Sequence, residues 1–224
     1  FQVNSYTLGD QHSPVIASLA DGGFVFVWIS SGQDGSDFGI FAQRYAADGS
    51  PAGGEFQVNT YTASRQFLPA VAALPDGGFV VTWTSLGQDG SSSYGVFAQR
   101  FAADGSPAGD EFQVNTDTSS DQYISAVAAL ADGGFVITWA SWLQDGSGDG
   151  IYAQRYAADG TPIGGEFQVN TYTSSSQTEP RISALADGGF IVTWSSDGQD
   201  GDSYGIFAQI YGADGTSVGS EFQV

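Results

Sequence analysis

One ten-residue segment recurs four times in this chain and constrains its fold more than any other feature. The segment "LADGGFVFVW" begins at Leu19, and close copies begin at Leu74, Leu130 and Leu185. The segment "FQVN" has the same period, and its last copy, "FQV", begins at Phe222. Successive copies of this second segment start 55, 56, 55 and 55 residues apart. A fixed period of this length indicates a repeat architecture whose units pack on their neighbours.

Each repeat contains four short runs with the composition of β-strands. In the first repeat they span residues 14–19, 23–28, 39–45 and 55–59, and they are rich in Val, Ile, Phe and Tyr. Asp-Gly at Asp21 separates the first two runs, and Asp-Gly at Asp48 separates the last two. This pair tolerates the positive φ of a tight hairpin turn. Each repeat therefore predicts an up-and-down, four-stranded antiparallel sheet.

Such a sheet needs neighbours on both sides. The second and third runs are apolar on consecutive residues, as expected for strands covered on both faces. The first run holds small residues that suit a crowded axis, whereas Trp28, Trp83, Trp139 and Trp194 follow in the second run, further out. We predict an all-β chain that forms one β-propeller domain over residues 1–224. Its repeats span 1–55, 56–111, 112–166 and 167–221, and 222–224 form an additional terminal strand.

Other arrangements fit less well. An immunoglobulin-like sandwich needs about 100 residues in each domain, and a β-solenoid has much shorter coils. The ring size stays open, because five "FQV" segments accompany only four sets of the other runs. The repeats can close as four blades or form half of an eight-bladed ring in a dimer. We also expect the chain to be a mature or excised piece of a longer protein.

The net charge of the chain limits the classes of molecule that it can bind. It carries 25 acidic residues against five arginines, and the net charge is -20. Such a molecule repels nucleic acid and anionic membrane surfaces, and it attracts divalent cations. No segment is long and apolar enough to predict membrane insertion. The absence of cysteine excludes disulfides and thiolate metal sites.

The loops between the second and third runs are rich in aspartate, serine and glycine. Carboxylate, hydroxyl and carbonyl oxygens on such turns can form a Ca²⁺ site, although none of these loops matches the EF-hand spacing. The alternative is that each aspartate only fixes its turn by accepting backbone N–H bonds. The candidate calcium ligands are Asp34, Asp37, Asp89, Asp145, Asp149, Asp200 and Asp202.

The loops that lead into each first run vary most between repeats. One position holds His12, Phe67, Tyr123 and Thr178, and Arg65 lies nearby in the second copy. Variation on a repeated scaffold indicates a recognition surface, and the alternative is neutral drift in exposed loops. Trp142 has no counterpart in the other repeats and, if exposed, can stack on a sugar ring. We therefore take Trp142, His12, Phe67, Tyr123 and Arg65 as candidate ligand-binding residues.

The repeat unit resembles a known type of repeat. The pattern "FQVNTYT…PAVAALPDGGFVVTW…GQDGSSSYGVFAQRFAADGSPAGDEF" is similar to units of large secreted bacterial proteins of the RTX type or the calcium-binding adhesin-like type. This resemblance covers all four repeats and implies an extracellular or cell-surface setting and a role in adhesion. The RTX nonapeptide itself is missing, so the resemblance does not extend to calcium binding by that motif.

The sequence gives little sign of catalysis. His12 is the only histidine, and no serine lies in a nucleophile-elbow context. An enzyme on a ring scaffold needs one repeat that breaks the pattern with clustered polar residues, and we find none. We therefore expect no enzyme but a secreted binding or adhesion module that recognises glycans or extracellular matrix through its loop face. The alternatives are a purely structural repeat that forms a homo-oligomer and, less favoured, a glycan-cleaving enzyme with two catalytic carboxylates.

Overall fold

The computed structural model describes all residues, 1–224. It contains sixteen strands, and no helix that could cross a membrane is present. The strands are β1 (Gln11–Ser18), β2 (Phe24–Ser31), β3 (Phe38–Tyr45), β4 (Phe56–Gln57), β5 (Gln66–Ala73), β6 (Phe79–Leu86), β7 (Tyr94–Phe101), β8 (Phe112–Gln113), β9 (Gln122–Ala129), β10 (Phe135–Trp142), β11 (Asp149–Tyr156), β12 (Pro162–Gln168), β13 (Gln177–Ala184), β14 (Phe190–Asp197), β15 (Tyr204–Tyr211) and β16 (Ser217–Gln223).

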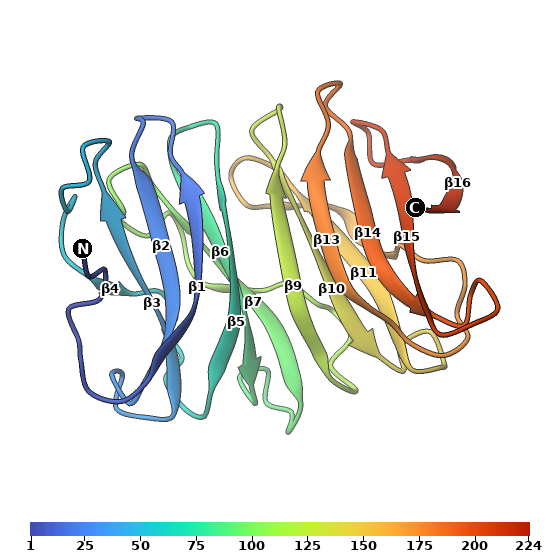
Figure 1. The fold of residues 1–224 in the computed structure, drawn as a ribbon, viewed down its shortest axis with the longest axis horizontal. Coiled ribbons are helices and arrows are strands. Elements are labelled where there is room, and N and C mark those ends of the chain that lie inside the picture. The colour runs from blue at the N-terminus through green and yellow to red at the C-terminus, as the bar shows by residue number, and fades with distance from the viewer.

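The strands form four antiparallel sheets of four strands, each in chain order. The first sheet is β1-β2-β3-β4, and the other three repeat this order. The sheets stand side by side like the blades of a propeller, from the first blade at the N-terminus to the fourth at the C-terminus (Figure 1). The predicted all-β propeller with four-stranded antiparallel blades is confirmed.

The Asp-Gly-Gly turns form the hairpins for a local reason. Gly22 has φ of 83°, and the N–H of Gly23 donates to Asp21 Oδ1 at 2.8 Å. A Cβ atom on Gly23 would lie 2.4 Å from the carbonyl oxygen of Tyr45 on β3. The first glycine therefore supplies the turn conformation, and the second allows close approach of the neighbouring strand.

The fourth strand differs in length between repeats. It has only two residues in β4 and β8, where an isolated bridge at Pro51 or Pro107 replaces its first part. It has seven residues in β12 and β16. The longer strands contain the β-branched Ile163 and Val218, which favour extended backbone.

The inner strands β1, β5, β9 and β13 lie along the axis and contact their neighbours in that order. This placement confirms that the run of small residues lines the axis. Each inner strand carries a bulge at the same position, where a residue other than glycine has φ between 52° and 55°. These residues are Ser13, Leu68, Ile124 and Glu179.

The core lies between blades rather than inside them. Three clusters of buried apolar side chains join the first blade to the second, the second to the third and the third to the fourth. Trp83, Trp139 and Trp194 each belong to one cluster and are at most 1% exposed. The expected core role of the four repeated tryptophans is confirmed: Trp28 of the first blade is also buried, with 4% exposure, although it belongs to none of the three clusters.

The four blades form an open arc. No apolar cluster joins the fourth blade to the first, and these two blades extend to opposite sides in Figure 1. The single chain therefore does not close on itself as a four-bladed ring. It presents one uncovered blade face at each end of the arc.

Candidate functional site

The third repeat departs from the other three at the start of its third strand. Asp149 opens β11 and pairs with Trp142 of β10. At the same position in the register, the other repeats have the aromatic residues Phe38, Tyr94 and Tyr204. A carboxyl group thus replaces an aromatic ring in one blade only.

The neighbour of this position changes with it. In the second blade, the rings of Phe67 and Tyr94 meet edge to face with centroids 5.2 Å apart. In the third blade, the corresponding Tyr123 donates a hydrogen bond from its hydroxyl to Asp149 Oδ1. The third blade has therefore exchanged an apolar contact for a phenol–carboxylate pair.

Asp149 is a buried carboxyl group with shifted acidity. The residue is only 7% exposed, and its backbone N–H donates to the Ser176 hydroxyl of the fourth blade at 3.3 Å. Burial raises the pKa of Asp149, and the negative charges of Asp145 and Asp121 raise it further. The hydrogen bonds from Tyr123 and Ser176 lower this pKa, but the net shift is upward. Asp149 therefore keeps its proton to a higher pH than an ordinary aspartic acid.

A hollow of about 370 Å³ lies beside this carboxyl group, between the second and third blades. Its lining is aromatic apart from one carboxylate. Asp121 contributes this carboxylate, and its Oδ1 accepts the backbone N–H of Tyr94 at 3.0 Å. Trp142 is 40% exposed at the edge of the hollow. The lining residues are Phe67, Tyr94, Asp121, Tyr123 and Trp142.

The structure brings three of the five candidate ligand-binding residues together, namely Trp142, Phe67 and Tyr123. It places the other two elsewhere. His12 lines a separate cavity on the end face of the first blade. Arg65 forms an ion pair with Asp37 at 3.3 Å, and both side chains are nearly half exposed.

The candidate calcium ligands are spread over four separate loops. Asp34, Asp89, Asp145 and Asp200 each accept the backbone N–H two residues further on, as turn-forming aspartates do. Asp37 pairs with Arg65, and Asp149 pairs with Tyr123. No group of three or more His, Asp or Glu side chains that could hold a metal ion is present. Calcium binding, including a role for Asp202, stays a prediction.

A second hollow lies on the axis, where residues of all four inner strands meet. It has a volume of about 370 Å³ and includes the bulge residues Ser13, Leu68 and Ile124. Arg181 is its only charged lining residue. The axial hollow therefore offers no carboxylate, whereas the hollow of the third blade has Asp121 in its lining and Asp149 beside it.

The expectation that no repeat breaks the pattern is wrong. Besides Asp149, the third repeat has Asp117 where the others have tyrosine and Ser125 where the others have proline. A position-by-position comparison of the four repeats contains this signal. The many repeated turn aspartates obscure it, because Asp149 is the same residue type as they are.

No protein-family model and no curated protein matches this sequence. Solved structures do share its fold. A Dyadobacter fermentans protein of unknown function matches 99% of this chain and 66% of its own, with 13% identity and a TM-score of 0.62. An endo-arabinase from Bacteroides thetaiotaomicron matches 94% of this chain over 78% of its own length, with 18% identity and a TM-score of 0.55. An α-L-arabinofuranosidase from Lactobacillus brevis matches 94% of this chain over 71% of its own length, with 14% identity and a TM-score of 0.55.

The chain spans slightly less than two thirds of the Dyadobacter protein and 44% of a Hadza microbial sialidase that also shares its fold. At these identities the likeness concerns the fold alone. It nevertheless overturns two expectations, the non-catalytic adhesion module and the absence of enzyme activity. The solved structures that share this fold include an endo-arabinase, a family-43 glycoside hydrolase and an endo-1,4-β-xylanase.

Proposed function

We propose that this chain is a glycan-cleaving hydrolase whose reaction centre is the hollow of the third blade. One observation carries the proposal: Asp149 is buried, holds its proton above the ordinary pKa of aspartic acid and lies beside an aromatic hollow that contains a second carboxylate, Asp121. The likeness of the fold to glycoside hydrolases supports the same reading.

The two carboxyl groups match the needs of glycoside hydrolysis. A protonated acid must donate to the glycosidic oxygen as its bond to the anomeric carbon breaks, and an ionised carboxylate must assist attack by water. Asp149 has the raised pKa that the acid requires. Asp121 is the one carboxylate that lines the hollow, and we assign it the role of assisting the attack by water. Water supplies the hydroxyl group of the new reducing end and the proton that restores the acid.

The aromatic lining gives the hollow its affinity for sugar rings. Phe67, Tyr94 and Trp142 present ring surfaces on which the C–H face of a pyranose or furanose packs, and Trp142 is the most exposed of the three.

The charge of the site selects among glycans. No cationic residue lines the hollow, and the negative charges of Asp121 and Asp145 act on Asp149. The whole chain adds a net charge of -20. Sugars with carboxylate groups are therefore repelled, and we propose neutral polysaccharides as the substrate class.

The test measures release of reducing ends from arabinan, xylan and, as an anionic comparison, polygalacturonate. We expect the wild type to cleave a neutral polymer and the Asp149→Asn variant to lose roughly 100-fold or more of that activity, since the variant has no proton to donate. Asp110→Asn changes an exposed aspartate of the second blade and serves as the matched control. No cleavage of any neutral polymer, or equal loss in both variants, would refute the proposal.

We further propose that the enzyme works outside the cell, as the RTX-type resemblance of the repeat implies. Extracellular polysaccharides are accessible there, and the high negative charge keeps the chain soluble. Native mass spectrometry before and after treatment with EDTA tests the accompanying calcium prediction. A calcium-bound mass that EDTA removes supports it, and an unchanged metal-free mass contradicts it.

A further inference from the structure

The three internal joints between blades share one design. One blade contributes a β-branched aliphatic residue of its third strand, and the next blade contributes the tryptophan of its second strand. Ile40 and Trp83 lie in the first such cluster, as do Val96 with Trp139 and Ile151 with Trp194 in the others. All three residues of the first kind are completely buried.

A hydrogen bond repeats at each joint as well. The backbone N–H of Ile40 donates to Oδ1 of Asn59, the asparagine of the "FQVN" segment that leads into the second blade, at 2.7 Å. Val96 and Ile151 make the same bond to Asn115 and Asn170, each at 2.7 Å. Each joint thus combines an apolar contact with one defined donor and acceptor.

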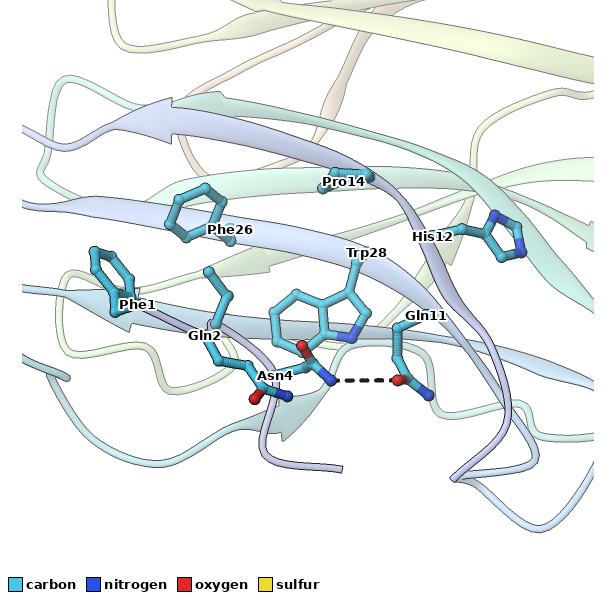
Figure 2. A pocket seen from close by; sticks show the side chains of 9 residues that line it. Phe1, Gln2, Asn4, Gln11, His12, Pro14, Phe26 and Trp28 are labelled. Atoms are coloured by element: carbon cyan, nitrogen blue, oxygen red, sulfur yellow. Dashed lines mark hydrogen bonds between the residues drawn. The ribbon is translucent and has the colours of Figure 1, made fainter. Parts of the chain in front are cut away.

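The first blade presents the receiving half of this joint without a partner. Phe1, Phe26 and Trp28 surround an open cavity of about 390 Å³ on its end face (Figure 2). Asn4 lines the same cavity and donates to Gln11 Oε1 at 3.2 Å, as Asn59 donates to Gln66 in the second blade. No hydrogen bond occupies Oδ1 of Asn4, which is the atom that accepts the backbone N–H at the other joints.

The fourth blade presents the inserting half, also without a partner. Ile206 is the counterpart of Ile40 and is 48% exposed, whereas Ile40 is completely buried. Val224 is 75% exposed, whereas the equivalent Val58 of the first blade is 2% exposed. The end face of the fourth blade therefore exposes residues that the internal joints bury, and the end face of the first blade has an open cavity at the place of the joint.

We propose that a second copy of this chain docks on these faces, with the fourth blade of each copy on the first blade of the other. Ile206 then fills the cavity beside Trp28 of the partner copy, and its backbone N–H meets Oδ1 of the partner's Asn4. Two such joints join the two arcs of four blades into one closed ring of eight blades. This inference does not depend on the proposed function.

The two terminal segments compete for one position in this joint. Phe1 packs on Tyr45 with ring centroids 5.1 Å apart, as Phe56 of β4 packs on Phe101 of the next blade at 5.3 Å. In the docked pair, Phe222 of the partner copy packs on Tyr45 in the position that Phe1 occupies in the single chain. β16 is held by pairing with β15, whereas Phe1 is 84% exposed. The segment Phe1–Val3 is therefore the one that gives way.

Charge opposes this association. Each copy carries a net charge of -20, and the repulsion between two copies is screened by salt. Association should therefore strengthen as the ionic strength rises, because salt screens the repulsion between the two negatively charged copies.

The test is sedimentation of the full chain over a range of concentrations, at low salt and in about 1 M NaCl, where the screening length is about 3 Å. We expect the mass to rise from 23.3 kDa to twice that value, with tighter association at high salt. Ile206→Gln should weaken association roughly tenfold or more by removing apolar burial at each joint. Phe1→Ala should strengthen association by loosening the competing segment.

The matched control is Ile163→Gln, because Ile163 is 44% exposed on β12 but lies away from both end faces. Far-ultraviolet circular dichroism of each diluted variant verifies that the blades remain folded. A mass of 23.3 kDa at every concentration and salt level would overturn the proposal. Species larger than two copies, or equal effects of Ile206→Gln and Ile163→Gln, would also overturn it.

Discussion

At the scale of single residues, identical amino acids play opposite roles according to their surroundings. Asp104 lies in an exposed hairpin turn, where the Ser106 hydroxyl and backbone N–H donate to its carboxylate and lower its pKa. Asp149 lies in a buried position, and its pKa is raised. The first aspartate stabilises the fold when ionised, whereas the second is stable in the fold when protonated.

Asp149→Asn should stabilise the fold more at pH 7 than at pH 3. The free energy of unfolding of the variant minus that of the wild type should therefore be more positive at pH 7. A raised folded pKa gives stability that is present below the unfolded pKa and lost as pH rises through the folded pKa. The wild type therefore carries a cost at neutral pH that the uncharged asparagine avoids. Urea denaturation of both proteins at both pH values measures the difference. A difference that does not grow with pH contradicts the assigned shift.

Asp104→Asn should show the opposite dependence. The pKa of Asp104 is lowered, so its contribution is present above the unfolded pKa and is lost as pH falls through the folded value. The variant should be less stable than the wild type at neutral pH and equal to it in strong acid. Denaturation curves over this acid range provide the check, and a variant that is equally stable at neutral pH would show that the turn hydrogen bonds contribute nothing.

At the scale of strands and blades, stability resides in the joints. Trp139 is fully buried between the second and third blades, in contact with residues of both. Trp28 has the same place in the first blade, but no preceding blade covers it. Trp28 is nevertheless only 4% exposed, and it differs from Trp139 in bordering an open cavity.

Trp139→Ala should lower the free energy of unfolding by about 3–5 kcal/mol, the usual cost of removing a fully buried tryptophan. Trp28→Ala should cost less, because Trp28 borders an open cavity and its removal enlarges that cavity instead of leaving an enclosed void. Guanidinium unfolding at low protein concentration, where the second copy is absent, compares the two variants. Equal losses would mean that the end face of the first blade is as well packed as an internal joint.

The strands themselves were predictable from sequence, because turn residues and β-branched runs repeat at a constant interval. The length of the fourth strand was not, since it depends on whether Ala52 or the larger Ile163 occupies one position. The site was only partly predictable. Trp142, Phe67 and Tyr123 stood out by their variation, whereas Asp149 resembled the turn aspartates and its burial could not be read from the chain.

At the scale of the whole molecule, the repeat explains both the arc and its open ends. Each blade buries its faces only against neighbours, so four blades leave two faces uncovered. The sequence identified the blades but left the closure of the ring open. Closure depends on the angle between neighbouring blades. Many side chains packed between the blades determine this angle together, so no single residue reveals it.

If two copies close the ring, the melting temperature should rise with protein concentration, since association stabilises the folded state by mass action. Ile206→Gln should shift this dependence to about tenfold higher concentrations or beyond, while leaving the melting temperature at high dilution nearly unchanged, because Ile206 is half exposed in the single chain. Differential scanning fluorimetry over a hundredfold concentration range follows both proteins. A wild-type melting temperature that is independent of concentration would count against closure.

The central claim is that the third blade became a reaction centre by exchanging one aromatic residue for a buried acid. Asp149→Tyr restores the residue that the second and fourth repeats carry at this position, Tyr94 and Tyr204. The measurement is the rate of reducing-end release from a neutral polysaccharide by this variant and by the wild type. We predict a folded variant, at least as stable as the wild type, with no measurable hydrolysis. A stable Asp149→Tyr protein that cleaves the polymer at the wild-type rate would contradict the claim.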